Sequence, residues 1–96
     1  MQGGRRGPGH PDVLANLVSL STAYFKTGQP AKGVPPLEEA VRGFRARYGT
    51  GHPDTLRGIV SLARAYRDVR RDADALPLFE EAVKLTGPPR ATTFFA

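Results

Sequence analysis

A histidine and an aspartate occur close together at two places in this chain, where they could bind a metal or exchange protons. The tetrapeptide Gly-His-Pro-Asp occupies residues 9–12 and again residues 51–54. Imidazole and carboxylate groups are common zinc ligands and common general acids and bases. Two pairs of adjacent glutamates, Glu38–Glu39 and Glu80–Glu81, add carboxylates of the kind that hydrolytic enzymes use.

The arrangement of these residues nevertheless argues against a catalytic or metal site. His10 and His52 hold the same place in two copies of a repeat, and stacked helices would separate them by about 10 Å, whereas zinc requires nitrogen ligands at about 2 Å. No cysteine is present, and nothing holds a nucleophile against a base. Adjacent glutamates on a helix point about 100° apart, so we interpret them as solvated charges. We expect no catalytic, metal-binding or cofactor-binding residues and no enzymatic activity.

The repeat itself is the strongest pattern in the sequence. When the chain is shifted by 42 positions, 17 of 35 residues are identical between residues 7–41 and 49–83. A period between about 20 and 50 residues is typical of stacked repeats, each of which is one supersecondary unit. The chain therefore divides into a flexible tail at residues 1–8, repeats at residues 9–50 and 51–87, and a second tail at residues 88–96.

Apolar spacing of three and four predicts two helices in each repeat. The expected helices span about residues 11–27 and 31–48, then 53–69 and 72–86. Each Gly-His-Pro-Asp marks a helix start, because proline suits the first helical position and an aspartate favours the first turn. The expected core residues are Leu14, Leu17, Leu20 or Ser21, and Tyr24; Val34, Leu37, Ala40, Val41 and Phe44; Leu56, Ile59, Leu62 or Ala63, and Tyr66; and Leu76, Phe79, Ala82 and Val83.

Three features bear on the ends of these helices. Gly28 ends the first helix, since glycine adopts the left-handed conformation easily. Arg70 stands at the corresponding place in the second repeat, so we expect that turn to close differently. Pro35 and Pro77 lie more than one turn into their helices, which predicts either a late start or a kink.

Small residues at equivalent places would let the helices of each repeat approach closely. These are Ser21 and Ala63, Gly33 and Ala75, and Ala40 and Ala82. Together with "GHPD.L...VSL..AY" and "A..P....EAV", they resemble tetratricopeptide repeats, and in particular the 42-residue repeats of kinesin light chains. The resemblance implies an all-α fold in which two tandem αα-hairpins form a short right-handed superhelical stack. It also implies a scaffold without catalytic residues, whose first helices line a concave groove for peptide segments of other proteins.

Helical spacing indicates which side chains would face that groove. In the first repeat they are Val18, Thr22, Phe25 and Lys26, and in the second Arg57, Val60, Arg64 and Arg67. Arginine binds carboxylates through two hydrogen bonds, so the hypothesis is an acidic or C-terminal peptide lying across the groove. A solvated helix face would be rich in arginine as well. Kinesin light chain repeats often place paired asparagines in the first helix to hold peptide backbone, where this chain has Val18–Ser19 and Val60–Ser61.

Charge leaves an alternative open. The formal net charge of +5 favours acidic partners without choosing among them. A basic module that binds nucleic acid is the alternative reading, and Arg67, Arg70 and Arg71 are its candidate residues. We expect nucleic acid to be the weaker candidate partner, because aspartates alternate with these arginines at positions 68, 72 and 74.

The length of the apolar runs and the number of repeats bear on location and assembly. No apolar run approaches the roughly 20 residues that a membrane span requires, so we expect a cytoplasmic protein without membrane contact. Two repeats are fewer than the three or so that such arrays need to be stable alone. We therefore expect a fragment of a longer array, end-to-end self-association, or a partner packed on an exposed end.

Overall fold

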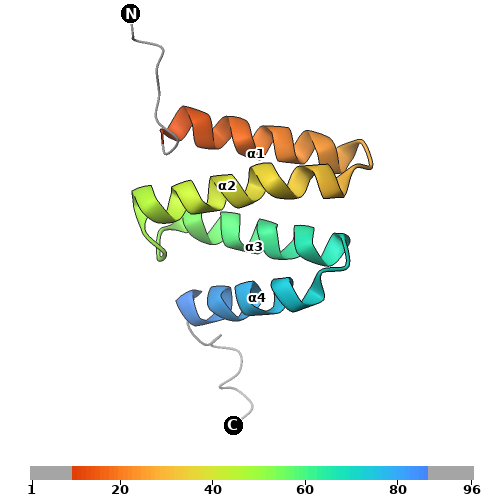
Figure 1. Cartoon of the computed structure of the whole chain (residues 1–96). Helices are drawn as coiled ribbons and strands as arrows, with labels where there is room; N and C mark the ends of the chain where they lie inside the picture. Colours follow the sequence, from red (N-terminus) through yellow and green to blue (C-terminus); the bar gives the residue numbers. More distant parts are fainter. Residues whose placement is uncertain (1–9, 87–96) are drawn as a thin grey trace, which may run out of the picture.

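A computed structural model describes residues 10–86, which form four helices and, within that range, no strand. They are α1 (Pro11–Lys26), α2 (Pro30–Tyr48), α3 (Pro53–Asp68) and α4 (Asp72–Thr86). Each helix packs antiparallel on the next, so that α1 and α4 lie at opposite ends of the stack (Figure 1). This confirms the all-α fold of two tandem hairpins. The expected tails, residues 1–8 and 88–96, lie outside the described residues.

The Gly-His-Pro-Asp motif begins the first helix of each hairpin. The imidazole Nδ1 of His10 accepts a hydrogen bond from the backbone N–H of Asp12 at 3.0 Å, and His52 does the same for Asp54 at 3.1 Å. A proline follows each histidine at the first helical position. The first N–H groups of a helix have no partner within it, so each histidine caps its helix. The His52 ring also stacks on Tyr48, with ring centroids 4.5 Å apart, which fixes the second hairpin against the end of α2.

The turns within the two hairpins close in the same way, contrary to the expectation for Arg70. Gly28 has φ +78°, and Arg70 adopts the same left-handed conformation with φ +64°. The N–H of Gln29 bonds to the carbonyl of Tyr24 at 2.8 Å, and its counterpart in the second hairpin runs from Arg71 to Tyr66 at 2.7 Å. The shared hydrogen bonds satisfy carbonyls at the end of each helix. In the second hairpin they hold Arg70 in a conformation that is unfavourable for residues other than glycine.

Small residues allow the close approach of the helices within each hairpin. The hydroxyl of Ser21 donates to the carbonyl of Gly33 at 2.9 Å, and a Cβ on Gly33 would lie 2.9 Å from the Phe25 ring. In α2, Gly43 leaves room for the fully buried Leu14, whose Cδ2 would lie 2.3 Å from an added Cβ. All six small residues named from the sequence are buried: Ser21, Gly33, Ala40, Ala63, Ala75 and Ala82.

The internal prolines do not delay the helices that contain them. Both α2 and α4 begin before their prolines, which are Pro35 and Pro36 in α2 and Pro77 in α4. A proline lacks the N–H that would bond to the carbonyl four residues back. In α2 the carbonyls concerned belong to Ala31 and Lys32, which are exposed, so water can replace the missing donors. Of the two alternatives predicted for these prolines, the late start is therefore excluded for both helices.

Some residues predicted from the sequence to lie in the core are exposed on the outer faces of α1 and α4. Ser21 rather than Leu20 is buried in α1, and Leu20 is 47% exposed. In α4, Leu76 and Val83 are 59% and 57% exposed, so their assignment to the core was wrong. The apolar spacing was read correctly, but in the described part of the chain α4 packs closely only on α3, and no helix covers its other apolar face.

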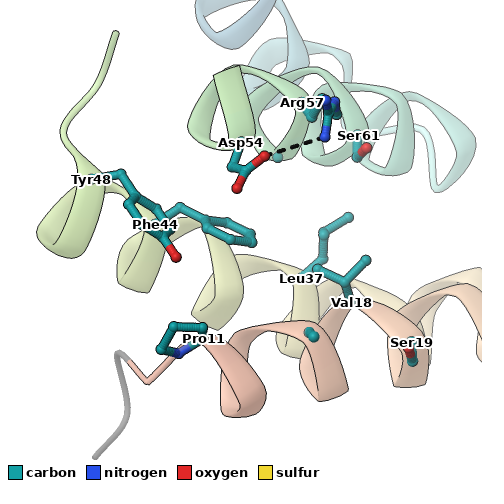
Figure 2. Close-up of a pocket in the computed structure, with 11 residues that line it drawn as sticks. Pro11, Val18, Ser19, Leu37, Phe44, Tyr48, Asp54, Arg57 and Ser61 are labelled. Atoms are coloured by element: carbon teal, nitrogen blue, oxygen red, sulfur yellow. Dashed lines mark hydrogen bonds and ion pairs between the residues drawn. The ribbon is translucent and has the colours of Figure 1, made fainter. Parts of the chain in front are cut away.

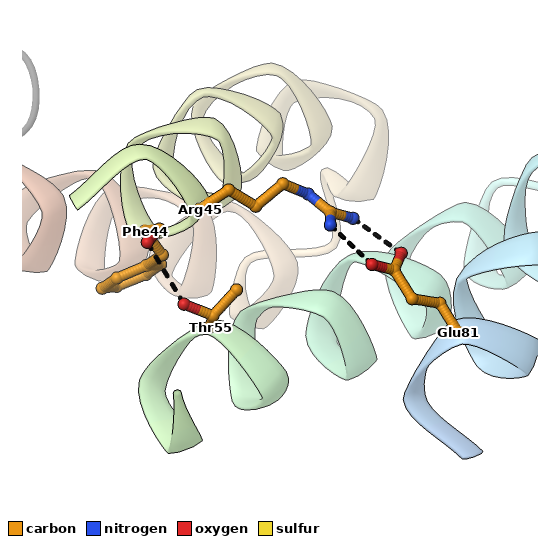
Figure 3. A network of polar contacts seen from close by, with 4 residues as sticks. All are labelled: Phe44, Arg45, Thr55 and Glu81. Carbon is orange, nitrogen blue, oxygen red and sulfur yellow. Dashed lines mark hydrogen bonds and ion pairs between the residues drawn. The ribbon is translucent and has the colours of Figure 1, made fainter. Parts of the chain in front are cut away.

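Polar contacts join the two hairpins on the side of the second helices. Arg45 of α2 forms two hydrogen bonds with the carboxylate of Glu81 in α4, at 2.6 and 2.8 Å, and these bonds lower the pKa of Glu81 below its usual value (Figure 3). The buried Thr55 hydroxyl donates to the carbonyl of Phe44 at 3.2 Å. Glu81 is thus an inter-helix partner, which corrects its interpretation as a solvated charge.

The hydroxyl of Tyr66 in α3 donates a short hydrogen bond to the carboxylate of Glu38 in α2. Burial of the phenol and this bond raise the pKa of Tyr66 to about 12. The guanidinium of Arg71 lies over the Tyr66 ring, 4.5 Å from the ring centroid, and pairs with the carboxylate of Asp74 at 2.9 Å. Glu38 is therefore a second glutamate that packs between helices instead of serving only as a solvated charge.

Candidate functional site

A cleft lies between α1 and α3, with α2 beneath it. One section encloses about 500 Å³. Figure 2 shows side chains from all three helices around this section. Its lining consists of Pro11, Ala15, Val18, Ser19, Leu37, Phe44, Tyr48, Asp54, Arg57, Gly58 and Ser61.

The cleft continues toward the carboxyl ends of α1 and α3. A second section of about 250 Å³ shares three lining residues with the first: Val18, Leu37 and Ser61. It adds Ser21, Thr22 and Phe25 from α1 and Arg64, Ala65 and Asp68 from α3. Because the sections adjoin, they form one elongated surface, which we call the α1–α3 groove. An elongated groove of this kind suits an extended chain better than a compact ligand.

The groove combines an apolar floor with hydroxyl groups. Leu37 is buried in the floor, and Val18 and Phe44 are half-buried beside it. Ser19 and Ser61 are exposed and line the groove from α1 and α3, at equivalent positions of the two repeats. A serine hydroxyl can donate one hydrogen bond and accept others, so the pair offers two polar contacts at repeat-related places.

The charges of the groove are balanced. Asp54 and Arg57 form an ion pair at 3.2 Å, in which the Arg57 side chain is 77% exposed. Farther along α3, Arg64 and Asp68 both line the groove. Within residues 10–86 the Arg64 side chain makes no hydrogen bond or ion pair. Arg64 is therefore the groove cation most available to a ligand carboxylate.

The structure places the eight residues predicted for the groove in different surroundings. Five line it: Val18, Thr22, Phe25, Arg57 and Arg64. The other three, Lys26, Val60 and Arg67, are not among its lining residues. Val60 packs against the core, and the Arg67 guanidinium lies 5.8 Å from the centroid of the Phe79 ring in α4. Lys26 is exposed in the last turn of α1.

Sequence reasoning missed the contribution of α2 and the two serines. The floor residues Leu37 and Phe44 were assigned to the core because their spacing is that of a buried stripe. Ser19 and Ser61 were noted only as a departure from the asparagines of kinesin light chains. The repeat offers a signal for them, because an identical exposed residue at equivalent positions of both first helices is brought to the same groove by stacking.

The residues that first suggested chemistry serve the helices instead. Each histidine uses its Nδ1 to cap a helix. Among residues 10–86 no three histidine, aspartate or glutamate side chains are grouped so that they could hold a metal ion. No helix in that range is long and apolar enough to span a membrane.

Comparisons with known proteins agree with this geometry. No curated protein matches the chain. A crystal structure of nearly identical TPR-like repeats, from a Podosopora anserina protein assigned as a kinesin light chain, superposes with a TM-score of 0.78 at 31% identity. A single-substitution variant of it gives a TM-score of 0.79, also at 31% identity. Each comparison covers 88% of this chain and 40% of the solved one. Residues 12–86 match the family model described as tetratricopeptide repeat, and the chain belongs to that family.

Proposed function

We propose that the α1–α3 groove binds a peptide segment of another protein, and that the chain is a non-catalytic interaction scaffold. Tetratricopeptide repeats generally serve as protein–protein interaction scaffolds. The observation that carries the proposal is the groove itself, which is elongated, has an apolar floor and is open along two helices. Both arginines in it are exposed. Since the chain spans only 40% of the length of the solved structures it matches, the partner is inferred from the groove alone.

The groove chemistry favours a particular kind of peptide. An apolar side chain would cover Leu37 and Val18, and replacing water over this floor would stabilise the complex. Ser19 and Ser61 would hydrogen-bond the peptide backbone. A carboxylate, from an acidic residue or the peptide's C-terminus, would bind Arg64 through two charge-assisted hydrogen bonds.

The aspartates in the groove narrow the acidic-peptide hypothesis. Asp54 and Asp68 would repel a peptide that is acidic throughout. Arg57 already has a partner in Asp54 at 3.2 Å, so it offers less to a ligand than Arg64. We therefore infer a peptide with one carboxylate near Arg64 and apolar residues before or after it.

An immobilised peptide library tests the proposal. The library varies the position of one acidic residue in an apolar background, and the best binder is then measured in solution by fluorescence anisotropy. Arg64→Glu should weaken binding about tenfold or more, because a charge-assisted pair becomes a repulsion. Arg42→Glu is the matched control, since Arg42 is exposed on α2 and does not line the groove. Its affinity should stay within about twofold of the original.

Two results would overturn the assignment. One is the absence of any binder in the library. The other is equal weakening by Arg64→Glu and Arg42→Glu, which would reflect overall charge instead of a groove contact. Circular dichroism of both variants confirms that they are folded, so that a loss of binding is not a loss of structure.

A further inference from the structure

The outer face of α4 carries the residue types that α2 uses to pack on α3. At equivalent positions of the repeat, Leu76 corresponds to Val34 and Val83 to Val41. Val34 and Val41 are each 3% exposed within the stack, whereas Leu76 and Val83 are 59% and 57% exposed. A hollow of about 390 Å³ lies on this face, lined by Phe79, Glu80, Val83 and Lys84.

The outer face of α1 is the counterpart of the face with which α3 meets α2. Leu20 corresponds to Leu62. Leu62 is 5% exposed, but Leu20 is 47% exposed, because α1 packs closely on α2 alone among the described helices. The two ends of the stack therefore present the two halves of an interface that the molecule already contains at its centre.

One polar pair of that central interface recurs at the ends. At the α2–α3 interface, Tyr66 donates its hydroxyl proton to Glu38. The equivalent residues are Tyr24 on α1 and Glu80 on α4. Glu80 is exposed, and the described part of the chain gives its carboxylate no hydrogen-bond partner. The same bond would form if α1 of one molecule lay on α4 of another.

Two of the differences between the interfaces partly compensate for each other in size. In α3, Gly58 lies so close to α2 that an added Cβ would be 3.2 Å from Val41 and 3.3 Å from the ring of Phe44. The equivalent of Gly58 in α1 is the larger Asn16, and the equivalent of Phe44 in α4 is the smaller Thr86. The larger side chain on one face thus lies opposite the smaller one on the other, which partly offsets these two changes in volume.

We propose that copies of this chain associate head to tail, with α1 of one copy packed on α4 of the next in the manner of α3 on α2. The interface is heterologous, since two different faces meet, and it leaves one free face at each end. Association therefore continues beyond the dimer. Each added copy lengthens the α1–α3 groove by two first helices, but the proposal does not depend on peptide binding.

Two substitutions each block one face. Val83→Arg places a charge on the outer face of α4, and Leu20→Arg does so on α1. Both side chains are exposed, so each variant should fold, which circular dichroism checks. Sedimentation equilibrium of the full chain should show an average mass that rises with concentration from 10.4 kDa to at least twice that value. Each variant alone should stay at the monomer mass.

An equimolar mixture of the two variants is the decisive measurement. Each variant keeps one intact face, so the mixture should form a dimer of twice the monomer mass and nothing larger. A concentration-independent monomer mass for the unsubstituted chain would overturn the proposal. So would a dimer of Leu20→Arg alone, because that result would mean that two α4 faces pair symmetrically. A mixture that stays monomeric while the unsubstituted chain associates would also overturn it.

Discussion

Arg70 offers a direct test of how the second hairpin closes. It has φ +64°, where a residue with a Cβ is strained by about 1–2 kcal/mol and glycine is not. Arg70→Gly removes that strain but gives the unfolded chain more freedom, which costs about 0.5–1 kcal/mol. The net gain in the free energy of unfolding is then about 0.5–1 kcal/mol, or a rise in Tm of about 2–8 °C for a domain of this size.

The side chain that is lost adds little to this balance. Arg70 is exposed, and within residues 10–86 its side chain makes no hydrogen bond, ion pair or ring contact. A charge near a helix carboxyl end contributes a few tenths of a kcal/mol, which Arg70→Ala removes without supplying glycine's freedom. Arg70→Ala is therefore the reference for Arg70→Gly.

Urea and thermal unfolding followed by circular dichroism measure the difference. The converse change, Gly28→Ala, should destabilise the first hairpin by about 0.5–1 kcal/mol. Nothing lies within 4 Å of a Cβ built on Gly28, so the effect there is conformational and not steric. If Arg70→Gly is no more stable than Arg70→Ala, the argument from backbone conformation is refuted.

Two further predictions concern ionisable contacts. The pKa of Tyr66 is raised to about 12, so the folded chain holds this proton more tightly than the unfolded chain. The resulting stability is present below about pH 10 and is lost as the pH rises toward 12. Tyr66→Phe should lower stability at neutral pH by about 1 kcal/mol and flatten the alkaline loss, as measured by urea unfolding across that range; an unchanged alkaline slope would contradict the assignment. For the second contact, a double-mutant cycle with Arg45→Met and Glu81→Gln should give a coupling free energy of about 1 kcal/mol at neutral pH. Because Arg45 lowers the pKa of Glu81, this coupling should disappear as the pH falls below the usual 4.5 of the carboxyl group, and a coupling that persists in acid would count against the ion pair.

The repeat made the fold predictable, because identity at a fixed period shows that two segments share one structure. Apolar spacing then placed the buried stripe on each helix. It could not show that none of the described helices packs on Leu76 and Val83, since their pattern is the same as that of the buried Val34 and Val41. A pattern identifies a face suited to burial, and only the arrangement of neighbours decides whether that face is buried.

The groove was predictable in outline but not in its chemistry. Helical spacing located one side of α1 and α3, and five of the eight proposed residues line the groove. Spacing alone could not show that Arg67 lies over the Phe79 ring, because that contact depends on where α4 packs. Asp54 pairs with Arg57, as their spacing of three on one helix permits, and this pair reduces the positive charge that the arginines suggested.

The Arg45–Glu81 pair has a mechanical consequence. It joins α2 directly to α4 and so bypasses α3. If the two hairpins rotate about the α2–α3 contact so that α1 and α3 approach each other, α2 and α4 must move apart and stretch this pair. The two bonds therefore resist bending of the stack in the direction that narrows the groove. The curvature of the molecule, and with it the width of the α1–α3 groove, is thus restrained by a contact on the opposite side from the groove.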